Sequence, residues 1–344
     1  MSQLKKTVYR LVSAAPLSWL RRLDGVEVLL PYHHLVSDEP VPHIDPLYPY
    51  KNRKQFERDL DYLLQRFRPL DPSSLPSALS GGGSLPKGSF LLTFDDGLRQ
   101  VHETIAPMLI RKGVPAVFFL NPAYLDNMEL FYRFKVGLVV GALDKEGRDG
   151  ARHREVRRVL GLQEGTAAAA VRGALLKIDY LNRAVVDRLE GCLAISFAEY
   201  LAVERPFLTR GQVTTLAGQG FHFGGHSMDH PNYRLLSLED QLDQTRRSCR
   251  FVREELGLNY TFFSFPHEDA DVHQAFFDRL AGEDLFRDAV YFGTQNQLDE
   301  PGNRMLHRFN AERPQYPTDG LVKSLLLYTG VKKWRGQMAV HRAP

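Results

Sequence analysis

The sequence contains few cysteines, no long apolar run and little net charge, and each absence narrows the possible functions. Only Cys192 and Cys249 occur among the 344 residues, so a disulfide framework is not indicated. Cys249 falls on an apolar helical stripe with Leu242 and Val252, where core packing is expected. No apolar run approaches the ~18 residues of a membrane span. The net charge of +3 gives no argument for a nucleic-acid partner.

The N-terminal segment 1–25 carries early basic residues, which raises the question of a targeting signal. Arg10 and Pro16 interrupt its apolar part, and no convincing small-residue cleavage site follows. We therefore expect a cytoplasmic protein without stable membrane insertion. An N-terminal helix lying at a membrane interface is the alternative.

Short apolar runs alternate with longer segments of helical periodicity, a pattern typical of a parallel β/α architecture. The length suits one barrel-sized α/β domain that carries an insertion. One helix is predicted around positions 56 to 67, and another after the capping-box pair Thr209 and Gln212. The predicted strands are 26–32, 89–94, 114–120, 220–224, 260–265, 289–294 and 305–309.

Residues 124–205 differ from the rest because they lack strand-like runs and are rich in Arg and Glu. They separate two predicted strands, so we interpret them as a helical insertion. The barrel would then comprise 26–123 and 206–315, followed by a C-terminal tail at 316–344. The stretch 72–88, rich in Pro, Ser and Gly, is interpreted as a surface connection.

Clusters of polar residues follow four of the apolar runs directly. The sequence YHH ends the first run, Asp95 and Asp96 end the second, HSMDH follows Gly225, and PHED follows Phe265. In a barrel of parallel strands the C-terminal strand ends converge on one face, where catalytic groups collect. We therefore expect the four clusters to meet in one pocket.

The spacing of two histidines indicates a metal site. His226 and His230 are four residues apart, so on a helical turn their rings would share one face. With Asp96 they make two histidines and one carboxylate, an arrangement that leaves a position open for water, as in catalytic zinc sites. Asp95 can then take a proton from the attacking water. Each motif is weak alone, because an Asp-Asp-Gly is usually a solvated turn and a His-x-x-x-His pair is often a surface feature.

Their combination and order resemble a known family. TFDDG at 93–97, HSMDHPNY at 226–233 and FFSFPHED at 262–269 are similar to the first three motifs of the polysaccharide deacetylase family, the NodB homology domain of carbohydrate esterase family four. LLPYHHLVSDEP at 29–40 is similar to the N-terminal strand of many members. The resemblance covers roughly residues 26–310. It implies a distorted (β/α) barrel and metal-dependent removal of acetyl from N-acetylated sugars, with Asp95 as base and Asp96, His226 and His230 as metal ligands.

Two motifs depart from the family pattern. Many members have an arginine two residues before the proline of the third motif, directed toward the catalytic aspartate, but this sequence has Ser264 there. Arg308 is a candidate to replace that arginine in space. Pro266 and His267 still match the loop whose backbone N–H faces the developing oxyanion, which makes His267 a candidate catalytic residue. His307, after Leu306, is a loose match to the general-acid histidine of the fifth motif.

Other residues near the strand ends have two interpretations. One of His33 and His34 should face the pocket and the other the barrel wall, since strand side chains alternate, although either could be a hydrogen-bonded core histidine. Tyr233 either shapes the substrate rim or begins a helix. Phe131 either lines a sugar platform or packs the insertion onto the barrel.

The sequence thus predicts a metal-dependent deacetylase, with zinc as the expected ion and an N-acetylated polysaccharide, oligosaccharide or lipid-linked glycan as the substrate. Two alternatives stay open. One is hydrolysis of another non-peptide amide at the same site, and the other is a barrel that binds glycan without turnover. An intact Asp95 weighs against the second alternative, and the missing arginine weighs mildly for it. The sequence does not define the sugar, the general acid or the oligomeric state.

Overall fold

The computed structural model describes residues 12, 15–24, 28–80, 85–146, 150–193, 196–300 and 302–344. Most of the expected N-terminal helical segment, and of the region interpreted for targeting, lies outside these residues. Its described part contains helix α2 (Leu17–Asp24).

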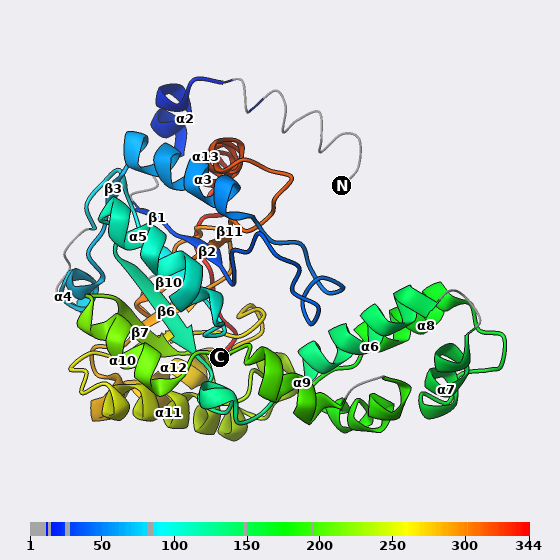
Figure 1. The fold of residues 1–344 in the computed structure, drawn as a ribbon. Helices are drawn as coiled ribbons and strands as arrows, with labels where there is room; N and C mark the ends of the chain where they lie inside the picture. Colours follow the sequence, from blue (N-terminus) through cyan, green and yellow to red (C-terminus); the bar gives the residue numbers. More distant parts are fainter. Residues whose placement is uncertain are drawn as a thin grey trace.

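The core is a parallel sheet of eight strands in the order β10-β9-β8-β7-β6-β5-β2-β11 (Figure 1). Strands β10 and β11 are separated only by Arg308, and they pair with β9 and β2 at opposite edges, so the sheet curls into a nearly closed barrel. Each predicted run overlaps at least one strand, and the predicted α/β barrel is confirmed. The strands are β2 (Pro31–His33), β5 (Leu92–Phe94), β6 (Ala116–Leu120), β7 (His222–Gly225), β8 (Phe262–Ser264), β9 (Val290–Gly293), β10 (Met305–His307) and β11 (Phe309–Asn310).

The barrel strands are short, between two and five residues each. Strand β6, with the sequence AVFFL, is buried at all its positions, as expected for a parallel strand covered on both faces. A second parallel sheet has the order β1-β4-β3. Its strands β1 and β4 come directly before the barrel strands β2 and β5 in the chain. Its strands are β1 (Val28–Leu29), β3 (Arg68–Pro69) and β4 (Ser89–Phe90).

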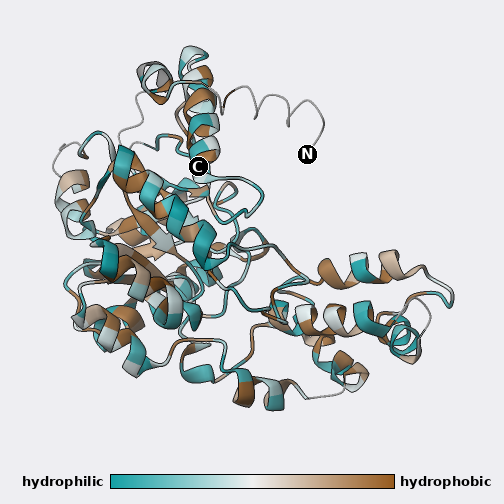
Figure 2. Cartoon of the chain, turned by 45° about the horizontal axis from the view of Figure 1, so that its top comes forward, coloured by the Kyte–Doolittle hydropathy of each residue, from teal (hydrophilic) through white to brown (hydrophobic). Residues whose placement is uncertain are grey.

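Helices cover the outside of the barrel, and Figure 2 shows hydrophobic residues concentrated on their inner faces and on the strands. The predicted capping box is present, since Thr209 accepts a hydrogen bond from the backbone of Gln212. Cys249 is buried on the inner side of α11, and both cysteines are free thiols. The covering helices are α3 (Arg53–Arg66), α5 (Ala106–Lys112), α10 (Arg210–Gly218), α11 (Leu238–Glu255), α12 (Gln274–Ala281) and α13 (Thr318–Trp334).

The segment interpreted as an insertion consists, in its described residues, of helices joined by turns and loops without a strand, and it projects to one side of the barrel (Figure 1). Its helices share a buried cluster that includes Phe134, Val139 and Leu175. Leu35 and Val41 from the loop after β2 join this cluster, which anchors the segment to the barrel. Its main helices are α6 (Tyr132–Glu146), α7 (Ala151–Val159), α8 (Ala168–Leu176) and α9 (Phe197–Glu204).

Two segments are more ordered than the sequence analysis expected. The stretch 72–88 contains a short 3₁₀ turn (Pro72–Ser74) and helix α4 (Leu75–Ser80). The expected C-terminal tail begins with α13, which packs side by side with α2, and its end returns to the barrel, where the backbone N–H of Gln274 donates to Ala343 O. Among the described residues, no helix is both long and apolar enough to span a bilayer.

Candidate active site

The C-terminal ends of four strands deliver their polar residues to one cavity of about 600 Å³. His34 follows β2, Asp95 and Asp96 follow β5, His226 and His230 follow β7, and His267 follows β8. All six line the cavity, as expected from the convergence of parallel strands.

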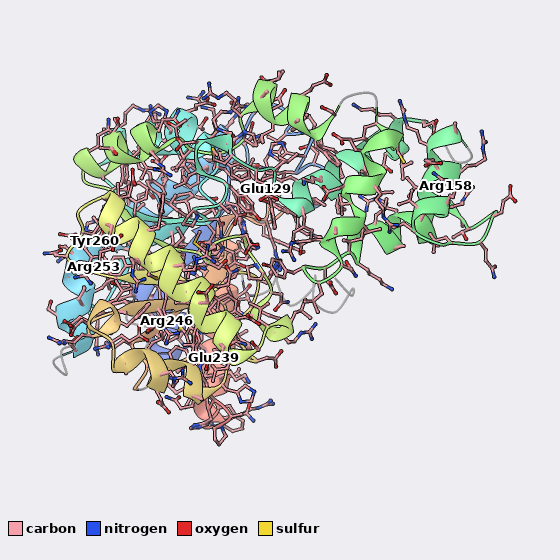
Figure 3. The ribbon with its side chains drawn as sticks, turned by 90° about the horizontal axis from the view of Figure 1, so that it is seen from below. Glu129, Arg158, Glu239, Arg246, Arg253 and Tyr260 are labelled. Carbon is pink, nitrogen blue, oxygen red and sulfur yellow. The ribbon has the colours of Figure 1, made fainter. Side chains whose placement is uncertain are left out.

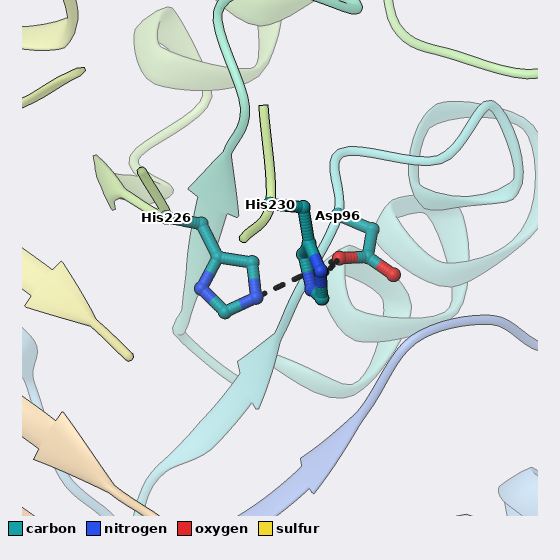
Figure 4. A group of neighbouring side chains, drawn as sticks. All are labelled: Asp96, His226 and His230. Atoms are coloured by element: carbon teal, nitrogen blue, oxygen red, sulfur yellow. Dashed lines mark ion pairs between the residues drawn. The ribbon is translucent and has the colours of Figure 1, made fainter. Parts of the chain in front are cut away.

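Asp96, His226 and His230 form the compact group shown in Figure 4. Asp96 Oδ1 lies 3.2 Å from His230 Nε2 and 3.6 Å from His226 Nε2. All three residues are buried, and Asp96 Oδ1 has no hydrogen-bond partner among the residues that the structure describes.

The backbone that presents this group is not the helical turn that the sequence analysis assumed. Residues 226–230 form an irregular loop after β7, in which Ser227 and His230 have positive φ angles of 62° and 58°. Asp96 also has a positive φ, at 72°. Left-handed backbone at residues other than glycine is unfavourable and is often found at functional sites. The rings still converge, because this backbone turns the chain back toward Asp96.

The two spacings from Asp96 Oδ1 to the imidazole nitrogens are close to those of a tetrahedral zinc site. Bonds of 2.0–2.1 Å in a tetrahedron place neighbouring ligand atoms about 3.3–3.4 Å apart, close to both distances from Asp96 Oδ1. Burial lowers the pKa of His226 to about 4, so its imidazole is neutral and available as a ligand. Its Nδ1 lies 2.8 Å from Ser264 O, which fixes the ring and leaves Nε2 for the ion. The residues therefore fit a divalent ion.

Asp95 is held by Arg308, as the sequence analysis suggested. The guanidinium donates to both carboxylate oxygens of Asp95, at 2.7 and 2.9 Å, and also to Ser264 Oγ at 2.5 Å. Burial alone would raise the pKa of Asp95, but the charge and hydrogen bonds of Arg308, together with the neighbouring histidines, outweigh it and lower the pKa, which favours the ionised carboxylate. The arginine missing from position 264 is thus replaced by one from the strand that closes the barrel.

His34 is the pocket histidine of the pair that the sequence left open. Its Nδ1 lies 2.8 Å from Glu312 Oε2, and the other oxygen of Glu312 accepts the backbone N–H groups of His34 and Leu35. Burial lowers the pKa of His34, but Glu312 more than offsets this and raises the pKa to about 10. His33 is buried and stacks on Phe94. The sequence analysis did not identify Glu312, because its only local signal is an acidic residue just after the last strand.

His267 lies at the edge of the cavity with its ring against the ring of His230, at a centroid distance of 4.6 Å. Its φ of 60° is left-handed, like the φ angles of Asp96, Ser227 and His230. No hydrogen bond from its backbone N–H occurs within the described part of the chain. That N–H is therefore available as a donor, in agreement with the position expected from the third motif.

The structure does not bring His307 to this cavity. Its side chain is fully buried, with Nε2 2.9 Å from Glu300 Oε2 and Nδ1 3.7 Å from Asp269 Oδ2. Arg342, from the end of the chain, donates to both of these carboxylates. This second group of His307, Asp269 and Glu300 could in principle hold an ion, but Arg342 already supplies its positive charge. The expected general-acid role of His307 has no support from this placement.

The helical segment 124–205 contacts the loop at 226–230 directly. Phe131 packs on His230 at a centroid distance of 4.9 Å, which joins the insertion to the barrel; it also lines the cavity, and its role as a sugar platform stays a prediction. Tyr180 donates to Asp229, which lies between the two histidines. Tyr233 is fully buried and begins a short 3₁₀ turn, so it is part of the core and not of the rim.

Comparisons with known proteins concern the sequence around Asp95 and Asp96 and the fold. Residues 82–160 match the family model described as polysaccharide deacetylase. No curated protein matches the chain. The fold is similar to that of the deacetylase PplD from Streptococcus pyogenes in complex with acetate, with a TM-score of 0.53 and 14% identity over 87% of this chain and 98% of that one.

Two further structures show the same likeness. IcaB from Ammonifex degensii matches with a TM-score of 0.52 and 16% identity, over 88% of this chain and 98% of that one. A de-N-acetylase from Aggregatibacter actinomycetemcomitans matches with a TM-score of 0.53 and 13% identity, over 87% and 99%. At these identities the likeness establishes the barrel, and the family model adds the sequence relationship. The sequence relationship to polysaccharide deacetylases covers residues 82–160, and the likeness over the rest of the chain is one of fold.

Proposed function

We propose that the protein is a metal-dependent deacetylase that removes acetyl groups from N-acetylated sugars of a polysaccharide, an oligosaccharide or a lipid-linked glycan. The observation that carries the proposal is that Asp96, His226 and His230 line one cavity together with Asp95, whose carboxylate is paired with the buried Arg308. Zinc is the ion that best suits two imidazoles and one carboxylate. When bound, such an ion acts as a Lewis acid toward a carbonyl and makes water more acidic.

Asp95 is the residue we assign as general base. It is ionised because of Arg308, and its Oδ2 lies 4.0 Å from His226 Nε2, so it borders the ligand set. From this position it can take a proton from a water that attacks the acetyl carbonyl. The backbone N–H of His267 is a donor for the oxygen that gains charge as the attack proceeds.

His34 is the residue we assign as general acid, in the place that His307 does not fill. It lines the same cavity, and its pairing with Glu312 through Nδ1 leaves Nε2 to protonate the departing sugar amine. The raised pKa of His34 keeps the ring protonated at neutral pH. Glu312 therefore keeps His34 protonated as a proton donor, and Arg308 correspondingly keeps Asp95 ionised as a proton acceptor.

Two observations support turnover of an amide rather than binding of a glycan alone. Arg308 donates to both carboxylate oxygens of Asp95, so the absence of an arginine at position 264 no longer favours a barrel that only binds glycan. The names of the similar structures include a deacetylase with acetate and a de-N-acetylase, which supports an acetamido group as the target.

Acetate release from N-acetylglucosamine oligosaccharides, measured on protein stripped of metal and then reloaded with zinc, tests the proposal. Activity should depend on zinc, and His226→Ala and His230→Ala should lose both bound metal and activity. His222→Ala is the matched control, because it removes a histidine of β7 that does not line the cavity. Full metal binding in both ligand variants, or acetate release that ignores zinc, would disprove the assignment.

A further inference from the structure

Both tryptophans of the chain are exposed, and they lie on two neighbouring helices. Trp19 of α2 is 59% exposed, and Trp334 at the end of α13 is 85% exposed. The two helices pack side by side on the barrel face opposite α11 (Figure 1). Large aromatic residues left in water on one layer of a protein usually mark an interaction surface.

The apolar part of this layer extends along α13. Tyr328 and Val331 are 40% and 42% exposed, and with Trp334 they follow each other at intervals of three residues. Residues at this spacing lie close to one face of a helix. The outer side of α13 therefore presents an apolar strip instead of the polar face that a helix facing only water would carry.

Basic residues accompany this layer in the sequence. Lys332, Lys333 and Arg335 flank Trp334. The sequence of residues 1–23, which includes most of α2, contains five Lys or Arg and no Asp or Glu. Aromatic side chains combined with Lys and Arg are the composition of segments that lie in the headgroup region of a bilayer.

A cavity of about 820 Å³ opens between α2, α3 and α13. Lys51 and Asp59 line this cavity and form a buried ion pair, so their charges cancel. The remaining charges of the lining are four cationic side chains and one carboxylate, Arg21, Arg58, Arg66, Lys323 and Asp319. A recess with this excess of positive charge suits an anionic headgroup.

We propose that the α2–α13 layer, defined as α2, α13 and the cavity beside them, docks on the surface of a membrane that contains anionic lipids. Charge complementarity selects this occupant over a second copy of the chain, since two such basic layers would repel one another. Tyr316 lines both this cavity and the active-site cavity, so docking would bring the deacetylase pocket beside the lipid surface. The proposal does not rest on the proposed function, because the binding can be measured without any substrate.

Intrinsic fluorescence gives a direct test, because the only two tryptophans lie in the proposed surface. Vesicles of phosphatidylcholine mixed with phosphatidylglycerol should shift the emission of the full chain to shorter wavelength, and vesicles of phosphatidylcholine alone should shift it much less. The variants Trp19→Phe and Trp334→Phe assign the shift to each residue, and both remaining tryptophans should respond. An unchanged emission on the anionic vesicles at low salt would overturn the proposal.

A charge variant tests the basic component. Each Lys or Arg near an anionic surface contributes about 1 kcal/mol, so Lys332→Gln with Lys333→Gln should weaken sedimentation with the anionic vesicles by roughly 10- to 30-fold. The matched control is Arg247→Gln with Arg250→Gln, which removes the same charge from α11, the helix that crosses the foreground of Figure 3 between the labelled Glu239 and Arg253. If both double variants lose the same amount of vesicle binding, the binding depends only on net charge, and the proposed docking surface is refuted. A shift that appears without vesicles and grows with protein concentration would identify a dimer instead.

Discussion

Moving the arginine that supports Asp95 from position 308 to position 264 gives the sharpest test of the active site. Arg308 is completely buried, and its side chain donates to Asp95 twice, to Thr93 Oγ1 at 3.0 Å and to Ser264 Oγ at 2.5 Å. Removing one partner of a buried ion pair typically costs about 3–5 kcal/mol, because the other charge stays buried without compensation. We expect Arg308→Ser to lower the free energy of unfolding by about this amount.

The same substitution should also remove the base. Without Arg308, burial dominates and the pKa of Asp95 rises, so the acid limb of the rate–pH profile should move to higher pH. General-base catalysis contributes about 10²–10⁴-fold, and a loss of kcat within that range is expected at neutral pH.

The double variant Arg308→Ser with Ser264→Arg should recover part of both losses. Ser264 Oγ already lies beside the guanidinium of Arg308, so an arginine at 264 enters the space that Arg308 vacates. Zinc-dependent acetate release and urea unfolding of the single and double variants measure the recovery. Arg304→Ser is the control, since Arg304 lies just before β10 but pairs with Asp288 outside the cavity. If the double variant folds and binds zinc but is no more active than Arg308→Ser, Arg308 does not act through Asp95.

Three other predictions follow from the site. Asp95→Asn should keep its metal and lose about 10²–10⁴-fold in kcat, whereas Asp96→Asn should bind metal more weakly and regain activity in excess zinc. Metal analysis and kinetics of both variants measure this. An Asp95→Asn protein that turns over like wild type would refute the division of roles. Glu312→Gln should lower the pKa of His34, so the alkaline limb of the rate–pH profile should move to lower pH; an unmoved limb would remove His34 from the acid role. Deletion of residues within 124–205 should reduce activity on a natural glycan more than on a small acetylated surrogate, since loops on this barrel face select substrate; equal losses with retained folding would contradict this.

The sequence by itself determined the barrel and the grouping of Asp96, His226 and His230. Both depend on local patterns, since apolar runs of strand length recur between helical segments and Asp96, His226 and His230 lie directly after such runs. Parallel strands deliver such positions to one end of the barrel, whatever the detailed backbone between them. That is why the ligand set was correctly grouped although the helical turn assumed for the two histidines was wrong. Spacing along the chain does not reveal that Ser227 and His230 adopt left-handed backbone.

Only the tertiary structure decided which residues near the last strand serve the site. His307 and Arg308 are adjacent and both were candidates, but neighbouring strand residues point to opposite sides, so one position of register separates them. The pairing of β10 with β9 and of β11 with β2 sets that register, and it directs Arg308 to Asp95 and His307 to Glu300. The pairing of His34 with Glu312 joins residues 278 positions apart for the same reason. Such contacts arise when the last strand closes the barrel against the first, and no local pattern in the sequence encodes that closure.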